Sequence, residues 1–248
     1  MIGAIAAGNC TVVKPSEYAV HSAKVLAKLL REIFDEKYVA VLLGGRAVNE
    51  AVLKERFDYI FFTGSLAVGS VVMEAAAKHL TPVTLELGGK SPCIVDKTAD
   101  IKRAARRIVW GKFLNAGQTC VAPDYVLVQE EVKEPLLRKM KHYIRKMYRD
   151  EPLLNPEYPK IINEKHFNRL KKMLLEQDGE IITGGRMDAD TLKIEPTLLA
   201  GLTGRSKVMQ EEIFGPVLPV FAYSDLAEVI RILQKKEKPL ALYLFTRN

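Results

Sequence analysis

The sequence predicts an α/β fold with mostly parallel sheets. Short runs of β-branched and other apolar residues alternate with longer windows of helical periodicity along the whole chain. The predicted strands are continuous apolar runs, which is typical of parallel strands that helices bury on both faces. No internal repeat and no low-complexity linker interrupts this order.

Individual elements follow from local patterns. The predicted strands lie at residues 10–13, 39–43, 59–62, 83–87, 93–96, 125–128, 180–183 and 216–221. The predicted helices cover roughly residues 20–34, 66–79, 100–114, 132–148 and 164–176, where apolar residues recur at helical spacing. The opening residues 1–9 lack the basic start of a signal peptide, and we expect them to form a buried helix that runs into a turn.

The composition indicates a folded protein, and it disfavours several function classes. The chain is 48% hydrophobic and 27% charged, so a sizeable core is feasible and global disorder is not expected. Much of the net charge of +7 lies in residues 133–149. Because apolar residues recur there at helical spacing, we predict a solvated amphipathic helix rather than a nucleic-acid or membrane patch. No apolar run is long enough to span a bilayer.

The cysteines indicate a reducing compartment. The three cysteines, Cys10, Cys93 and Cys120, form no CxxC pair and leave an odd count. This pattern disfavours a disulfide framework and a zinc site, so we predict no metal and a cytoplasmic location. Cys10 and Cys93 lie in apolar surroundings and are interpreted as inert core residues.

Cys120 differs from the other two cysteines in its context. It closes the segment NAGQTC at 115–120, which follows the helical window 100–114. A polar, glycine-containing segment can hold a thiolate where backbone N–H groups point at a substrate oxygen. From spacing alone, a catalytic and a structural role are equally open. A Cys–His protease pair is a further, less favoured alternative, because the four histidines are scattered over helical windows.

Glu86 lies in the mainly apolar predicted strand 83–87. A carboxylate that is buried without a partner is expensive, so the position needs an explanation. Glu86 could act as a general base for a water molecule. Alternatively, its carboxylate could accept hydrogen bonds from the backbone amides around Gly88 and Gly89.

Two segments in the first third of the chain are candidate nucleotide contacts. In YIFFTGSLAVG (59–69) a strand feeds a helix through a glycine turn, which presents backbone N–H groups to an anion. Gly64 permits a close backbone approach and the Ser65 hydroxyl can donate to a phosphate oxygen. In VVKPSE (12–17), Lys14 and Glu17 could grip a diol such as ribose.

Plain structural roles compete with both nucleotide interpretations. Residues 59–69 also fit an ordinary strand-to-helix turn. Residues 15–17 could simply start a helix, with Ser16 as its cap.

The segment MQEEIFGPV (209–217) places two adjacent carboxylates before an aromatic residue and a Gly-Pro turn. One carboxylate could bind a hydroxylated ligand while Phe214 covers a flat ring. The alternative is a loop that joins a helix to a strand.

These segments occur in one fixed order, and together they resemble a known family. AAGN, KPSE, FTGS, LELGGKSP, NAGQTC and EEIFGP resemble the NAD(P)-dependent aldehyde dehydrogenase superfamily. The longer stretches 78–93, 116–126, 208–217 and 237–243 are most similar to its class 3 branch, which oxidises medium- and long-chain aliphatic and aromatic aldehydes. The resemblance covers the whole chain.

The resemblance implies catalytic roles. Cys120 matches the nucleophile that attacks the aldehyde to form a thiohemiacetal, whose collapse delivers a hydride to the nicotinamide and leaves a thioester. Glu86 matches the base that activates the hydrolytic water. The backbone N–H of Cys120 would contribute to the oxyanion hole.

The resemblance also implies cofactor contacts and a domain order. Lys14 and Glu17 match the contacts to the adenosine ribose. Gly64 and Ser65 match the pyrophosphate turn. Glu212 and Phe214 match the contacts to the nicotinamide ribose. The cofactor is NAD or NADP, and Glu17 favours NAD because it should repel a 2′-phosphate. A truncated Rossmann-type cofactor domain would span 1–86, and an α/β catalytic domain with a mostly parallel sheet would span 87–248.

Finally, the resemblance implies that the chain is a fragment. The family's asparagine that supplies the second oxyanion donor, its dimerisation hairpin and its C-terminal tail would all lie outside the sequence. Intact members of the family form homodimers. Two alternatives to aldehyde oxidation therefore stay open: an inactive fragment that acts only by associating with a full-length subunit, and cofactor-free ester or thioester hydrolysis by Cys120 and Glu86.

Overall fold

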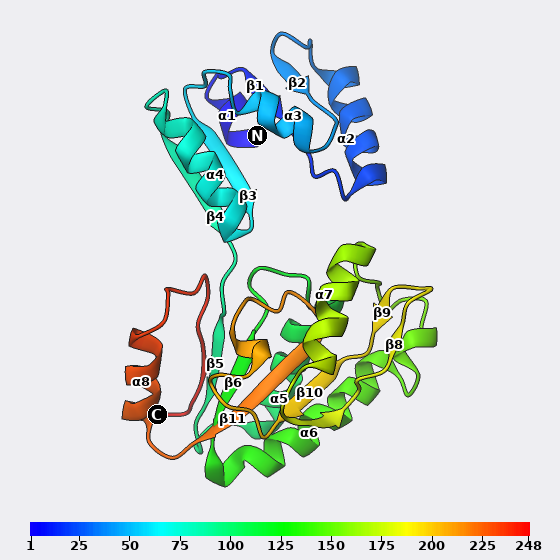
Figure 1. Cartoon of the computed structure of the whole chain (residues 1–248), viewed down its shortest axis with the longest axis vertical. Helices are drawn as coiled ribbons and strands as arrows, with labels where there is room; N and C mark the ends of the chain where they lie inside the picture. The colour runs from blue at the N-terminus through cyan, green and yellow to red at the C-terminus, as the bar shows by residue number, and fades with distance from the viewer. The chain divides into compact units, whose positions relative to one another are not determined.

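The computed structural model describes residues 1–248 and divides into two compact units, Met1–Glu86 and Leu87–Asn248 (Figure 1). The division falls where the sequence analysis separates a cofactor domain from a catalytic domain. The assignment of one function to each unit stays a prediction.

The first unit alternates strands and helices. Its elements are α1 (Ile2–Ala6), β1 (Thr11–Val13), α2 (Val20–Ile33), β2 (Val39–Val41), α3 (Arg46–Val52), β3 (Ile60–Gly64), α4 (Leu66–Ala77) and β4 (Val83–Leu87), whose last residue belongs to the second unit. β1 and β2 pair in parallel, and β3 and β4 form a separate two-stranded sheet. The predicted strands and helices of this region are confirmed, and α3 is an addition.

The first unit has a small core. Its cluster of buried apolar residues is Ala27, Leu30, Val39 and Val41. Two sequence expectations are wrong here. The sequence predicts that α1 is buried, but it has no buried residue. Within it only Ile5 packs against that cluster, and Ile2 is 82% exposed. Cys10 is exposed rather than a core residue, because it precedes β1 in the connection from α1.

The second unit is built around one six-stranded sheet. Its strands are β5 (Pro92–Val95), β6 (Tyr125–Gln129), β7 (Glu180–Thr183), β10 (Thr197–Ala200), β11 (Val217–Tyr223) and β12 (Tyr243–Phe245), in the order β12-β5-β6-β11-β10-β7. Every neighbouring pair is parallel except the antiparallel pair β10–β7. The predicted mostly parallel sheet is therefore confirmed.

Helices and short segments complete the second unit. The α-helices are α5 (Ile101–Phe113), α6 (Glu130–Tyr148), α7 (Glu164–Leu175) and α8 (Leu226–Gln234). Short 3-10 helices cover Leu114–Gly117, Pro152–Leu154 and Lys207–Met209, and a small hairpin joins β8 (Met187–Asp188) to β9 (Lys193–Ile194). The sequence patterns do not predict the short strands β8, β9 and β12. They also do not predict β10 or α8.

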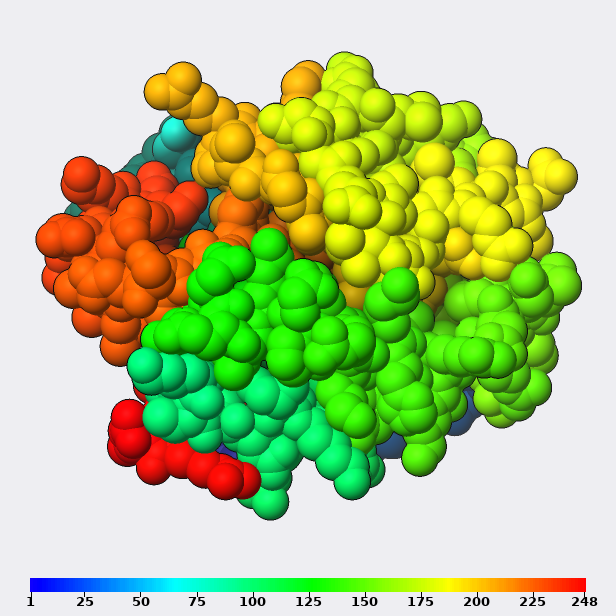
Figure 2. Space-filling view, turned by 90° about the horizontal axis from the view of Figure 1, so that it is seen from below, coloured from blue at the N-terminus to red at the C-terminus, as the bar shows by residue number.

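Apolar residues cover both faces of the sheet. Along β5, Cys93 and Val95 belong to the cluster that contains residues of α5 and α6, whereas Ile94 belongs to the cluster that contains residues of α7. α6, drawn in green, lies beside α5 on the face shown in Figure 2. The basic stretch 133–149 is therefore an amphipathic helix, as predicted, and Cys93 is a buried core residue.

No helix of the structure combines the length and the apolar character that a membrane span requires.

Candidate active site

Cys120 is presented by an unusual backbone segment. α5 ends at Phe113, and Asn115, Ala116 and Gly117 follow with φ values of 53°, 51° and 74°. Left-handed backbone is costly for residues with a Cβ, particularly for Ala116, so surrounding contacts must hold it in place. The segment redirects the chain sharply and leaves the Cys120 thiol exposed.

Gln118 supplies much of that support. Its side-chain amide donates to the carbonyls of Asn115 and Lys160, at 3.1 Å each, and its Oε1 accepts from the Ile162 N–H at 2.9 Å. Asn115 in turn donates to the Gln118 carbonyl at 3.1 Å. The polar residues before Cys120 thus tie the segment to itself and to residues 160–162.

Gly117 brings two distant motifs together. A Cβ at this position would collide with the Gly215 carbonyl, so only glycine fits there. NAGQTC and EEIFGP therefore lie against each other, as their predicted joint role in one site requires.

Glu212 lies against the glycines of the segment ELGGKSP. The Gly89 N–H donates to the Glu212 carboxylate, and the same carboxylate leaves no room for a Cβ on Gly88. Burial raises the pKa of Glu212, although the Gly89 hydrogen bond and nearby lysines act in the opposite direction. The Gly89 N–H, which the sequence analysis considered as a partner for Glu86, thus binds Glu212 instead.

A buried ion pair holds the segment that carries Glu212. Lys90 forms an ion pair with Asp124, and its ammonium also donates to the carbonyls of Val208 and Glu211 at 2.7 and 2.8 Å. Asp124, which is 3% exposed, accepts from the Ile213 N–H at 2.9 Å. Sequence reasoning assigned neither residue a role, although Lys90 lies in the motif ELGGKSP and Asp124 in the stretch 116–126.

Lys112 adds a second buried cation to this cluster. It lies on α5, is 1% exposed, and interacts electrostatically with Asp124, Glu212 and Lys90. Burial lowers the pKa of Lys112 to about 8. The helical pattern of residues 100–114 gave no signal that this lysine is buried.

Arg169 clamps the same segment from α7. Its guanidinium donates to the Glu211 carboxylate at 3.2 Å and to the carbonyls of Glu212 and Ile213 at 3.3 and 2.5 Å. Phe214, which follows Ile213, has a φ of 45° and is 39% exposed. The ring is therefore available to a ligand, while its backbone is held in a strained conformation.

The predicted phosphate contacts lie at the β3–α4 turn of the first unit. Ser65 is the N-cap of α4, and its hydroxyl accepts from the Val68 N–H at 3.4 Å. Gly64 lies against the Phe62 ring, which leaves no ordinary space for a Cβ. The turn therefore leaves amide N–H groups of the first turn of α4 without helical partners.

Lys14 and Glu17 follow β1 in the same unit. The Lys14 ammonium donates to the Pro15 carbonyl at 2.6 Å, and the Glu17 carboxylate lies against Gly45, which precedes α3. Ser16 does not cap a helix: it accepts from the Tyr18 N–H at 3.2 Å, and α2 begins only at Val20. The alternative in which residues 15–17 start a helix is therefore wrong.

The exposure of Glu86 differs from the sequence prediction. It lies in β4 as predicted, but its side chain is exposed rather than buried. β4 has a single neighbour, β3, so an outward-facing position on this strand is open to solvent. The argument from an unpartnered buried carboxylate does not apply to it.

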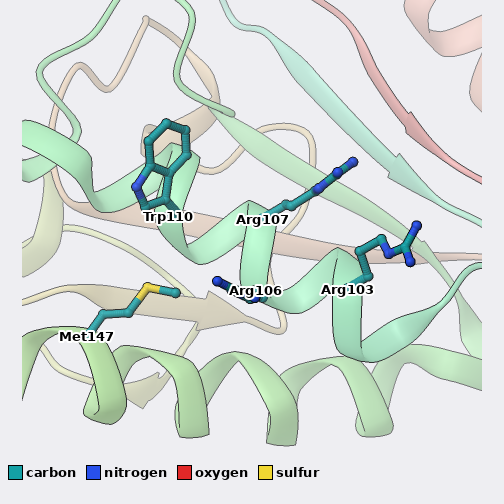
Figure 3. A pocket seen from close by; sticks show the side chains of 5 residues that line it. All are labelled: Arg103, Arg106, Arg107, Trp110 and Met147. Carbon is teal, nitrogen blue, oxygen red and sulfur yellow. The ribbon is translucent and has the colours of Figure 1, made fainter.

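A surface pocket of about 640 Å³ lies elsewhere on the second unit, between α5 and α6 (Figure 3). Its lining residues are Arg103, Arg106, Arg107, Trp110 and Met147. None of them is a predicted site residue, and no group of three or more His, Cys, Asp or Glu side chains in the structure could hold a metal ion.

The match to known proteins covers the whole chain. A family model described as the aldehyde dehydrogenase family matches residues 1–248. The chain belongs to the aldehyde dehydrogenase family. This membership confirms the resemblance that the motifs indicated.

Individual aldehyde dehydrogenases are similar over the full chain. Aldehyde dehydrogenase family 3 member A2 of Mus musculus is 49% identical over 248 residues, which are all of this chain and 51% of the relative. The dimeric, NADP-preferring aldehyde dehydrogenase of Rattus norvegicus is 48% identical over the same residues, which are 54% of its length. The chain thus spans about half the length of these curated relatives.

A solved aldehyde dehydrogenase has the same fold. The substrate-bound state of AldH from Staphylococcus aureus superposes with a TM-score of 0.97 at 48% identity, and the match covers all of this chain and 54% of that one.

Proposed function

We propose that this chain supplies the nucleophile and cofactor contacts for the oxidation of an aldehyde to a carboxylic acid with NAD(P). One observation carries the proposal: Cys120 is exposed beside a left-handed segment that packs, through Gly117, on the segment of Glu212 and Phe214. A thiol can attack a carbonyl carbon. A carboxylate beside an aromatic ring can bind a nicotinamide riboside.

The residues present fit a dinucleotide. The β3–α4 turn offers N–H groups and the Ser65 hydroxyl to a pyrophosphate, and Lys14 and Glu17 offer a cation and a carboxylate to a ribose. Glu212 can accept from ribose hydroxyls, and the exposed ring of Phe214 can cover a flat base. When bound, NAD(P) accepts the hydride that leaves the substrate carbon.

The proposed reaction assigns each step to a residue. The Cys120 thiolate attacks the aldehyde carbon and forms a thiohemiacetal. The backbone hydrogen bonds of this segment are donated by Gln118 N to Asn115 O and by Ala122 N to Thr119 O. The Cys120 N–H takes part in neither bond, so it can donate to the oxyanion. Loss of hydride leaves a thioester. Glu86 then takes a proton from water, whose oxygen attacks the thioester carbon, releasing the acid and the thiolate.

Aldehyde-dependent formation of NAD(P)H tests this proposal. A medium-chain aldehyde is mixed with NAD or NADP and the chain, and absorbance of the reduced cofactor is followed. We expect Cys120→Ala to abolish the signal and Cys10→Ala, which removes another exposed thiol, to leave it unchanged.

Two results would contradict aldehyde oxidation. Absence of turnover in the folded wild-type chain would favour the alternative of an inactive chain that acts by association. Cysteine-dependent ester cleavage without NAD(P), in the absence of aldehyde oxidation, would favour the hydrolytic alternative.

The proposal extends to the substrate, the assembly and the cellular location. We propose an aliphatic or aromatic aldehyde as substrate, since the motifs are most similar to the class 3 branch. The rat relative is named as dimeric and NADP-preferring, which supports a homodimer and the use of either cofactor. Three free cysteines support a reducing, cytoplasmic setting.

A further inference from the structure

The motif EKPLALY (237–243) has no role in the proposed reaction, yet it runs beside the segment ELGGKSP. The Pro239 and Leu240 backbone packs against Gly89, and the Ala241 N–H donates to the Ser91 hydroxyl at 3.3 Å. The motif ends in Tyr243, the first residue of β12, which pairs with Cys93 of β5. Its partly buried ring packs against the core cluster that includes Cys93.

The Tyr243 hydroxyl reaches the residue that follows the nucleophile. It donates to the Val121 carbonyl at 2.5 Å. The Ala122 N–H donates to the Thr119 carbonyl at 3.0 Å, so residues 119–122 form a turn with Cys120 and Val121 at its two central positions. Tyr243 therefore binds the carbonyl that this turn leaves free.

Electrostatics agree with this placement. Burial raises the pKa of Tyr243, and a negative charge on the sulfur of Cys93 or Cys120 raises it further. The hydroxyl is thus close enough to Cys120 to respond to a charge on its sulfur.

We propose that Tyr243 is a positioning residue for Cys120: by holding the Val121 carbonyl, its hydroxyl fixes the 119–122 turn and the direction in which the thiol points. The inference rests on the proposed nucleophilic role of Cys120. Thr119 is partly exposed and Cys120 and Val121 are exposed, so packing constrains these three residues little, and one hydrogen bond to a sheet strand decides much of their order.

Alkylation of the thiols tests the inference without aldehyde or cofactor. The 248-residue chain is treated with iodoacetamide, and the alkylation rates of Cys120 and Cys10 are measured by peptide mass spectrometry. Cys10 is exposed and lies in the other unit, so the ratio of the two rates corrects for reagent and protein quality. In Tyr243→Phe we expect this ratio to change by about fivefold, the value of one neutral hydrogen bond of about 1 kcal/mol.

Tyr158→Phe is the matched control. The Tyr158 hydroxyl also donates to a carbonyl, that of Ile194 at 2.8 Å, and its loss should lower the melting temperature without changing the ratio. Replacing Tyr243 by 3-fluorotyrosine keeps the ring and the donor, so this variant should retain the wild-type ratio. If Tyr243→Phe does not fold, a ratio in the 3-fluorotyrosine chain that differs from the wild-type ratio would overturn the inference, because the donor is still present.

The outcomes separate the two hypotheses. An unchanged ratio in folded Tyr243→Phe, or an equal change in Tyr158→Phe, would overturn the positioning role. A normal effect of Tyr243→Phe on alkylation, combined with no aldehyde turnover in the wild-type chain, would support the positioning role and contradict the proposed reaction.

Discussion

At the scale of single residues, the site depends on a few side chains held in costly environments. Lys112 is a lysine in a fully buried position, and Ala116 and Phe214 have left-handed backbone. Such costs persist only where surrounding contacts outweigh them. Their concentration around the segments of Cys120 and Glu212 supports the proposal that the reaction takes place in this region of the second unit.

The lowered pKa of Lys112 predicts a pH dependence of stability. The folded pKa is about 8 and the unfolded pKa 10.5, so the unfolded chain binds more protons between these values and stability rises with pH there. Relative to Lys112→Met, the wild-type chain should gain on the order of 3 kcal/mol across this window. Urea unfolding followed by fluorescence of Trp110, the single tryptophan, measures the difference.

Lys102→Met is the control for this prediction, because Lys102 lies on the same helix and is exposed. If the two variants show the same pH dependence, the burial of Lys112 has no energetic consequence and the prediction is wrong.

Gly117 is the residue that should tolerate substitution least. Its φ of 74° and the adjacent Gly215 carbonyl both oppose a Cβ, so Gly117→Ala should cost about 2 kcal/mol or more and reduce aldehyde turnover strongly. Gly204→Ala is the matched control, since nothing lies within 4 Å of the added Cβ. Thermal unfolding and turnover are measured for both, and equal effects would contradict the packing argument.

At the scale of elements, the segment 208–214 is held by charged side chains from three other parts of the chain. Lys90 after β4 and Asp124 before β6 hold the segment around Glu211 from one side, and Arg169 of α7 holds it from another. The position of segment 208–214 is thus set by α7 and by the two connections that carry Lys90 and Asp124. Hydrogen bonds from neighbouring side chains of this kind hold a loop residue in the geometry that a ligand contact requires.

Arg169 tests this support. Arg169→Lys keeps the charge but loses the planar fork that reaches the carbonyls of Glu212 and Ile213. We expect the KM for NAD(P) to rise about tenfold, roughly the cost of losing one hydrogen bond from a charged donor, with a smaller change in kcat. Lys172→Met, on the exposed side of the same helix, should leave both parameters unchanged. A selective fall in kcat would contradict a role in cofactor placement.

At the scale of the whole molecule, the two units differ in how much apolar surface they bury. The first unit has one cluster of four buried residues, whereas the second has two large clusters on the two faces of its sheet. Phe61 of β3, for example, is 67% exposed. Since burial of apolar surface is the main stabilising contribution, the units should differ in stability.

Hydrogen exchange followed by mass spectrometry checks this difference. Amides of β1, β2, β3 and β4 should exchange well before those of β5, β6 and β11 in the absence of ligand, because their opening exposes less apolar surface. Saturating NAD(P) should slow exchange around the β3–α4 turn if the proposed pyrophosphate contact is correct. Equal protection of the two units would contradict the argument from core size.

The sequence by itself determined the fold class, the main strands and helices, and the family. It did so because continuous apolar strands, helical periodicity and glycine-containing turns are local patterns that the chain displays wherever it folds. The motifs that carry Cys120 and Glu212 were also visible as strings of residues.

Only the tertiary structure decided which groups meet. The contact of Gly117 with Gly215, the Gly89–Glu212 hydrogen bond, the buried cluster of Lys90, Lys112 and Asp124, and the reach of Tyr243 to Val121 all join residues that are distant in sequence. The same holds for the exposure of Glu86 and Cys10, which local apolar context predicted wrongly. Burial depends on what packs against a residue, and the chain order alone does not contain that information.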